Sequence, residues 1–576
     1  MSARNAISRS ILLAIVVVIV IIIAAAGYVA LTATTSSVSS STSTSSATTS
    51  PSTTTSTSST SSSSSTATTS FTNQSTPPLN IQVSQDFGAL DPAVGNTYTQ
   101  VLYEYNVYDN LVTQSPNATV LPHVAKNWTV SPNGTTYIFT LNQGIHFHNG
   151  DVLNASDVAF SMERALALGQ GFSFIWYGIL NSSGIKVLNS TAIEFQTETV
   201  FSPFVGTLSL LFIVDQQAVM QHLANTSSSN PMGDWGTAWL NSHDAGSGPY
   251  TLANYQPGVS LTLQRFDNYW MGWSNNPRPY NTVTYTLVTS DATVLSLAKS
   301  NQLNWVSTYL QYPTYLALQK MGWQFNTYNS STFYTIKMNT AKAPLNSLDF
   351  RKAVSYAFNY TSLQYIFPGS TQLAGPVPQG YLDHNPNVTM YSQNIALAKQ
   401  LLSESGVNPS NTSLTIVYVA GNIQEQQLAE EFQKDMALIG LQVKIQPQTF
   451  LTITQLATNK TTTPDFSIIE FIPFYPDADS LLFSVYDTAS HGSWISMEWF
   501  SNSTVDNLLS QERATFNQTL RQQIFYQLQQ DIVSQAPDLF LAIAPYYVAL
   551  SPQVGGYTFS LAPSFEYGLY TVYYKG

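Results

Sequence analysis

Three carboxylates flank an aromatic segment late in the chain. Glu470 precedes residues 471–476 (FIPFYP), and Asp477 and Asp479 follow them. Two carboxylates about 5 to 9 Å apart are what a glycosidase needs, but spacing along the chain does not set their distance in space. The sequence contains no Gly-x-Ser-x-Gly elbow and no Walker phosphate loop. These residues are therefore candidates for acid–base chemistry, without a second motif to support it.

Two histidines could in principle bind a metal ion. His146 and His148 are two residues apart in a strand-like stretch, so their side chains would share one face. No carboxylate or third histidine stands at a supporting spacing, and the other histidines are scattered. The chain has no cysteine, which excludes disulfides, zinc–thiolate sites, iron–sulfur clusters and cysteine nucleophiles. We expect no metal and no cofactor.

The composition narrows the class of partner. The 576 residues include 20 Lys and Arg and 32 Asp and Glu, which gives a net charge of -12. This negative charge argues against binding nucleic acid through phosphate contacts. Only 9% of residues are charged. A protein with few carboxylates has few native ion pairs to lose when carboxylates are protonated, so the composition suits an acidic exterior. Drift in the composition of its source proteome would explain the same numbers.

The chain after Leu79 alternates short strands with amphipathic helices, as in an α/β fold. Asn154, with Asp157 three residues on, predicts a capped helix start. Leu428, Phe432 and Met436 repeat at helical spacing, and Gly440 can close that helix. We predict strands at 137–141, at 441–445 and from 539 onward, and helices at 154–167, around 428–436 and at 517–535.

The N-terminus predicts an export or anchoring segment. Arg4 and Arg9 precede an uncharged run, residues 11–31, which as a helix would be about 30 Å long and would just cross a bilayer. The positive residues place the body outside the cell. The small residues 24–27 also fit a cleaved secretory signal, and Arg9-Ser10 resembles the archaeal class III, prepilin-like signal. We favour a membrane anchor, because the run is longer than a usual signal core.

Residues 32–78 are almost entirely Ser and Thr, with no charge and few apolar side chains. Such a segment cannot bury enough surface to offset its ordering entropy, so it predicts a disordered and O-glycosylated stalk. Asn-x-Ser/Thr sequons recur through the body and support an exterior glycoprotein. They include those at Asn117, Asn127, Asn133, Asn154, Asn181, Asn189, Asn329, Asn359, Asn411 and Asn502.

Several blocks of sequence occur in a recognisable order. They are 90–92 (LDP), 121–128 (LPHVAKNW), 131–141 (SPNGTTYIFTL), 144–150 (GIHFHNG), 155–161 (ASDVAFS), 246–250 (GSGPY) leading to 269–270 (YW), and 350–357 (FRKAVSYA). Together they closely resemble the family 5 extracellular solute-binding proteins, the oligopeptide- and dipeptide-type receptors of ABC importers. The match spans nearly all of residues 79–576. Several motifs in the same order identify a family far more specifically than any single motif does.

The resemblance implies an α/β, two-lobed periplasmic-binding-protein-like (type II) fold with an extra small domain in the first lobe, closing over its ligand at a hinge. By similarity, the chain crosses between the lobes near 305–309 and near 537–545. The domains would be the anchor or signal at 1–31, the stalk at 32–78, the first lobe at 79–305 with the extra domain at about 122–200, the second lobe at 306–535, and C-terminal strands at 536–576 that return to the first lobe.

The resemblance also implies where the ligand binds. Peptide receptors of this family usually carry an acidic residue in a loop of the second lobe, and Phe474 stands at that position here, unless Asp477 or Asp479 substitutes. This departure favours an oligosaccharide over an oligopeptide, because sugars need aromatic platforms and neutral hydrogen-bonding groups. The expected ligand-binding residues are Asn96, Tyr98, Trp305, Phe450, Phe471, Phe474 and Asp477.

The function that the resemblance implies is that of a receptor and not of an enzyme. It would capture an oligosaccharide or oligopeptide at the cell surface, anchored to the cytoplasmic membrane through residues 11–31, and deliver it as a monomer to an ABC permease and its ATPase. The alternatives are a secreted hydrolase (glycosidase or peptidase) and a structural surface protein. Hydrolysis of oligosaccharides or peptides by the isolated body would distinguish the hydrolase.

Overall fold

The computed structural model describes residues 76–115, 119–307, 310–381, 383–475, 477–560 and 568–576. Within these ranges no helix is both long enough and apolar enough to span a membrane. The predicted anchor and the predicted stalk up to residue 75 lie outside the described residues, and so does the sequon at Asn117.

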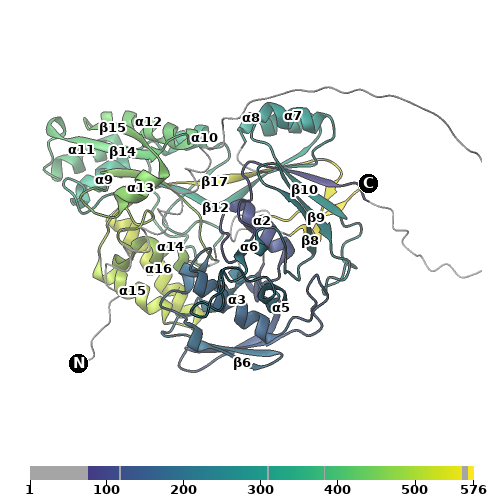
Figure 1. Ribbon diagram of the computed structural model, residues 1–576. Coiled ribbons are helices and arrows are strands. Elements are labelled where there is room, and N and C mark those ends of the chain that lie inside the picture. The colour runs from purple at the N-terminus through teal and green to yellow at the C-terminus, as the bar shows by residue number, and fades with distance from the viewer. Residues whose placement is uncertain (1–75, 116–118, 308–309, 382, 476, 561–567) are drawn as a thin grey trace, which may run out of the picture. The chain divides into compact units, whose positions relative to one another are not determined.

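A mixed sheet, eleven-stranded within the described residues, runs through the body (Figure 1). Its strands follow the order β15-β14-β16-β12-β17-β11-β1-β10-β9-β8, with β13 paired to β17. In that order they are Gln442–Gln448, Ser413–Val419, Phe466–Phe471, Gln324–Met338, Asp538–Leu550, Trp305–Val306, Leu79–Val83, Thr282–Leu287, Ser260–Arg265 and Tyr250–Gln256, with β13 at Thr371–Gln372.

The two longest strands, β12 and β17, are antiparallel neighbours in the middle of this sheet. Their pairing runs from Gln324 opposite Leu550 to Lys337 opposite Asp538, with two register irregularities. On the far side of β17 lies β11, and on the far side of β12 lies β16. The two strands thus join the half of the sheet that begins with β1 to the half that contains β14, β15 and β16.

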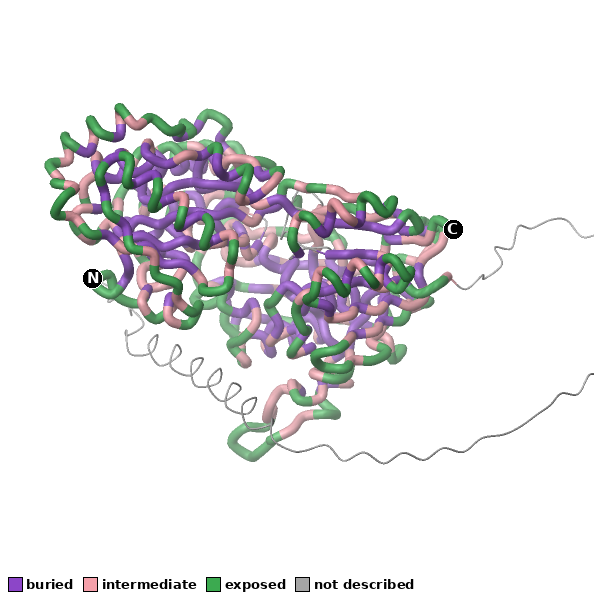
Figure 2. Tube along the Cα trace, turned by 90° about the horizontal axis from the view of Figure 1, so that it is seen from above, coloured by how far each residue is buried: buried purple, intermediate pink, exposed green. Residues whose placement is uncertain are grey.

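Buried apolar residues gather in two large clusters. The first core region draws on residues 79–285, with Trp305, Tyr475 and residues from β17 to the C-terminus. The second core region draws on residues 333–543. A smaller cluster lies where α7 (Asp291–Lys299) and α8 (Tyr312–Lys320) pack beside β12 and β17. Figure 2 shows these buried stretches inside a cover of exposed loops and helix faces.

A separate four-stranded antiparallel sheet lies within the region predicted as the extra domain. Its order is β4-β5-β7-β6, formed by Ala125–Val130, Thr136–Leu141, Ala192–Gln196 and Ile185–Asn189. Helix α3 (Ala155–Leu168) begins as predicted: the Asn154 side chain accepts a hydrogen bond from the Ser156 amide, and Asp157 accepts one from the Asn154 amide. Gly169, in the left-handed conformation, ends the helix.

The other local predictions are also confirmed. Leu428, Phe432 and Met436 form the buried face of α12 (Ile423–Ala437), and the predicted strand that follows is β15. The predicted helix at 517–535 is α16 (Gln518–Gln535), and the predicted C-terminal strand is β17. The remaining helices include α2 (Tyr98–Val107), α9 (Leu348–Ala357), α10 (Leu363–Ile366), α11 (Ile395–Glu404), α13 (Phe450–Ala457), α14 (Asp479–Tyr486) and α15 (Ser503–Arg513).

Candidate functional site

Two adjoining cavities lie between the first and second core regions. The smaller has a volume of about 400 Å³ and the larger about 700 Å³. Each is of the size that small ligands occupy in proteins. Both are lined by Tyr98, Asn422, Glu470 and Ile472, so these four residues mark where the two cavities meet.

The smaller cavity has an apolar wall from the second core region. Strand β16 and the loop after it contribute one side, and α13 with Trp494 contributes another. The first core region supplies Gln85, Asn96, Tyr98 and Phe172. The second supplies Val419, Asn422, Glu425, Phe450, Ile453, Ile468, Ile469, Glu470, Phe471, Ile472, Pro473, Phe474 and Trp494.

The larger cavity is more polar. Its wall includes five tyrosines besides Tyr98 and three glutamines, which supply hydroxyl and amide groups. The tyrosines are Tyr312, Tyr334, Tyr365, Tyr546 and Tyr547, and the glutamines are Gln311, Gln424 and Gln427. Tyr365 is 89% exposed, so its ring is free to turn toward a bound molecule.

Three of the predicted aromatic platforms line the smaller cavity, but their rings pack against one another. Phe471 is only 4% exposed and stands edge-on to Phe333 and Phe474. Phe474 also meets Phe174 of the first core region edge-on, with 4.9 Å between ring centroids. Phe450 is 47% exposed and stands edge-on to Trp494. Of the three, Phe450 is the ring with the most open surface.

Two other predicted residues do not lie at either cavity. Trp305 is 1% exposed within β11 and packs edge-on against Tyr557, 4.9 Å away between centroids. Asp477 accepts two hydrogen bonds from Arg521, with N···O distances of 2.6 and 2.7 Å. Its carboxylate is thus neutralised inside the protein. Asp479, the other candidate for an amine contact, forms an ion pair with Arg513.

Asn96 and Tyr98, two other predicted ligand-binding residues, line the smaller cavity. The Tyr98 hydroxyl lies 2.5 Å from the Ser307 hydroxyl and 3.3 Å from the Tyr546 hydroxyl. Ser307 follows β11 and Tyr546 belongs to β17. A residue of the cavity wall is therefore hydrogen-bonded near both places where the resemblance puts a crossing between lobes.

Two carboxylates face the cavities from the second core region. Glu470 is in β16 directly opposite Tyr334 of β12, whose hydroxyl hydrogen-bonds to its carboxylate. Glu425 lies in the first turn of α12, where it accepts hydrogen bonds from the Val419 amide (2.7 Å) and the Asn422 side chain (3.1 Å). Glu470 was singled out above only as a candidate acid, and Glu425 was missed. The sequence pattern that could have indicated Glu425 is the spacing Asn422-x-x-Glu425, which is that of a helix cap.

Burial perturbs both carboxylates. It raises the pKa of Glu470 above its ordinary value, against the opposing effect of the Tyr334 hydroxyl. It raises the pKa of Glu425 to about 7, opposed by the Val419 amide and assisted by the negative charge of Glu470. In both cases burial disfavours the ionised carboxylate more than its hydrogen bonds favour it.

The two candidate histidines contact other groups of the protein. The structure shows no group of three His, Asp or Glu residues suited to a metal ion among its described residues. His148 has both ring nitrogens engaged, one with Asp244 at 2.6 Å and one with the Gly248 carbonyl at 3.0 Å. His146 is exposed and faces the Gly144 carbonyl.

A ligand-sized cavity between two core regions that share a central pair of strands is the architecture of a solute-binding protein. The chain belongs to the bacterial extracellular solute-binding proteins, family 5, whose middle-region model matches residues 119–493. It is therefore an extracytoplasmic solute-binding receptor of an ABC importer, and not an enzyme.

Known relatives cover most of the chain. The probable D,D-dipeptide-binding periplasmic protein DdpA of Escherichia coli (strain K12) is 24% identical over 496 residues, which are 84% of this chain and 91% of that protein. Heme-binding protein A of Haemophilus influenzae is 25% identical over 479 residues, 78% of this chain and 84% of that protein. The binding protein DppA of Helicobacter pylori, solved with the peptide STSA, has a TM-score of 0.69 at 20% identity over 87% of this chain and 98% of that one.

Proposed function

We propose that this receptor captures peptides that have a free amino terminus, and that Glu470 receives the ammonium group. The observation that carries the proposal is the position of Glu470, which is one of the residues shared by both cavities. A charge-assisted hydrogen bond from an ammonium to a buried carboxylate is strong and directional. By the resemblance, Phe474 stands at the family's acidic position, so Glu470 would perform the same task from β16, the strand directly before that loop.

The electrostatics support this assignment. Among the described residues, the ion pairs of Lys, Arg and His involve other carboxylates, and neither Glu470 nor Glu425 takes part in one. A buried carboxylate without a cation is costly, and a bound ammonium removes that cost. Glu425, the second carboxylate in the smaller cavity, adds to the negative potential.

The cavity walls suggest how the rest of the peptide fits. The apolar smaller cavity suits the side chain of the first residue, and the larger cavity, rich in hydroxyl and amide groups, suits the peptide backbone that follows. Two of the relatives are named for or solved with peptides. An anionic ligand such as heme, the ligand in the name of the Haemophilus relative, would place its carboxylates beside Glu470 and Glu425.

An oligosaccharide, which the sequence favoured, has less support. The relatives compared above are not named for sugars. A sugar platform needs an open ring face, whereas Phe471 and Phe474 stand edge-on to their neighbours. Trp305 is buried away from both cavities. The peptide is therefore the ligand that the site geometry favours.

The mode of action that we propose follows the family. The two core regions act as lobes that close over the peptide, with residues 305–309 and 537–545 as the crossings. The body stands outside the cell on the Ser/Thr-rich stalk, anchored by residues 11–31 in an archaeal, membrane-anchored arrangement, and hands the peptide to an ABC permease and ATPase. The positive residues Arg4 and Arg9 before the apolar run support this topology.

The test is calorimetric titration of residues 76–576 with a peptide library in free-amine and N-acetylated forms. Acetylation removes the ammonium, so it should weaken the best free-amine peptide about a hundredfold, and Glu470→Gln should weaken that peptide by a similar factor. The exposed Glu430, on the same lobe, provides the matched control Glu430→Gln, which should bind like the wild type. Equal binding of free and acetylated peptides by the wild type would contradict the proposal.

A further inference from the structure

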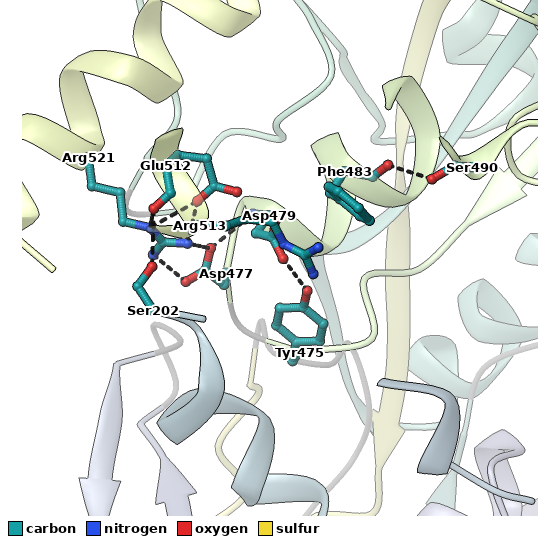
Figure 3. A network of polar contacts seen from close by, with 9 residues as sticks. All are labelled: Ser202, Tyr475, Asp477, Asp479, Phe483, Ser490, Glu512, Arg513 and Arg521. Atoms are coloured by element: carbon teal, nitrogen blue, oxygen red, sulfur yellow. Dashed lines mark hydrogen bonds and ion pairs between the residues drawn. The ribbon is translucent and has the colours of Figure 1, made fainter. Parts of the chain in front are cut away.

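The two core regions also touch at a place away from the cavities. The backbone amide of Ser202, in the first region, donates a hydrogen bond to the Arg513 carbonyl at 2.8 Å, and its hydroxyl donates to the Glu512 carbonyl at 3.2 Å (Figure 3). The Arg513 guanidinium lies 4.7 Å from the centre of the Phe201 ring. Arg513 and Glu512 form the C-terminal end of α15, which packs in the second region. The contact therefore spans the two regions.

Arg513 is held in place from its own side. Its Nε lies 3.0 Å from the buried carboxylate of Asp479, and its guanidinium lies 3.6 Å from the centre of the Phe483 ring. Burial alone would raise the pKa of Asp479, but the charge of Arg513 overrides it and lowers that pKa. The guanidinium thus packs against one ring from each region, Phe483 and Phe201, while its charge is neutralised by Asp479.

Asp479 is the first residue of α14, directly after the loop that lines the smaller cavity. Residues 472–474 of this loop face the cavity, and the Phe474 amide donates to the Ser480 hydroxyl at 2.8 Å. At its other end the loop is fixed by Asp477, which binds Arg521 of α16. Arg521 also binds Glu512 at 2.8 Å. Asp477 and Asp479 therefore connect this part of the chain to the second contact between the regions, through Arg521, Glu512 and Arg513 (Figure 3).

We infer that Arg513 is a positioning residue for ligand capture: it stabilises the closed arrangement of the two lobes through Phe201 and Ser202 without touching the ligand. This inference rests on the proposed closure of the lobes. Contacts that exist only in the closed arrangement shift the equilibrium between open and closed lobes toward the closed one. Less of the ligand's binding free energy is then needed to close the lobes. Arg513 would set the affinity for every ligand by a common factor.

The test measures closure without any ligand. Because the chain has no cysteine, Asn127→Cys and Lys460→Cys place one spin label on an exposed site in each region. Electron–electron resonance on residues 76–576 then gives the distance distribution between the labels. Arg513→Lys keeps the charge beside Asp479 but loses the flat guanidinium, and Phe201→Leu removes the ring while keeping its bulk. Each should raise the ratio of long to short distances about threefold to tenfold.

The matched control is Arg265→Lys. Arg265 also pairs with an aspartate (Asp267) and lies over an aromatic ring (Trp273, 5.6 Å), but all three residues belong to the first region. It should leave the distances unchanged. Should Arg513→Lys fail to fold, Phe201→Leu and Ser202→Ala carry the test from the other region. Distances identical to those of the wild type in these variants would overturn the inference, whatever becomes of Glu470.

Discussion

Glu425 connects the chemistry of the cavity to the stability of the protein. Its pKa of about 7, raised mainly by burial, exceeds the usual pKa of a glutamate in an unfolded chain, about 4.3. Between these values the folded protein binds a proton that the unfolded chain does not. Folding stability from this group is therefore gained as the pH falls from about 8 to about 5, and lost as the pH rises through 7.

We predict that Glu425→Gln removes this dependence. The variant should be more stable than the wild type at pH 8, by up to about 3 kcal/mol, and similar to it at pH 5. Urea unfolding at both pH values measures the difference. Glu430→Gln, exposed on the same helix, should follow the wild type at both. An equal effect of Glu425→Gln at pH 8 and pH 5 would show that Glu425 is ionised throughout.

At the scale of the element, the central strands are joined by a buried ionic cluster. Lys337 of β12 lies 3.1 Å from Asp538 of β17 and 3.2 Å from Glu498, and all three side chains are almost fully buried. Tyr486 donates a further hydrogen bond to Asp538 at 2.6 Å. Burial raises the pKa of Glu498 to about 7, although the charge of Lys337 opposes that shift.

Lys337→Met should therefore be costly in a pH-dependent way. Removing one partner of a buried ion pair costs about 3 to 5 kcal/mol, because the remaining charges have no compensation. Protonation of Glu498 relieves part of that cost, so the variant should lose less stability at pH 5 than at pH 8. Urea unfolding of wild type and variant at the two pH values gives the comparison. The same loss at both would mean that the cluster tolerates the uncompensated charges.

Elements with a local signal could be predicted from the sequence. The cap at Asn154, the apolar face of α12 and the alternation in β15 are encoded within a few residues, and the ordered blocks indicated the family. The ligand site depends on contacts between residues that are far apart in the sequence. Asp477 is occupied by Arg521, 44 residues later, and Trp305 is covered by Tyr557, so neither spacing nor residue type could reveal that they lie away from the cavities.

At the scale of the whole molecule, the first described residue is already tied to the large sheet. The Thr76 hydroxyl donates to the Pro279 carbonyl and accepts from the Asn281 amide, both at 3.2 Å, so the chain is tied to the sheet three residues before β1. We predict that protease added to intact cells releases a soluble fragment that begins between residues 32 and 76 and unfolds like purified 76–576. Mass spectrometry of the fragment and thermal unfolding of both check this. Protection of the body in intact cells would contradict an exterior location.

The place of β17 in the sheet affects the order in which the protein can fold. It is the last strand of the large sheet to be synthesised, yet it lies between β12 and β11 and contributes Tyr546, Val548 and Leu550 to the first core and Leu539 to Ile543 to the second. Neither core is complete until the ribosome has passed residue 550. Contacts between such distant parts of a chain form slowly. A nascent chain that stays open for so long remains competent to be threaded through a translocation pore.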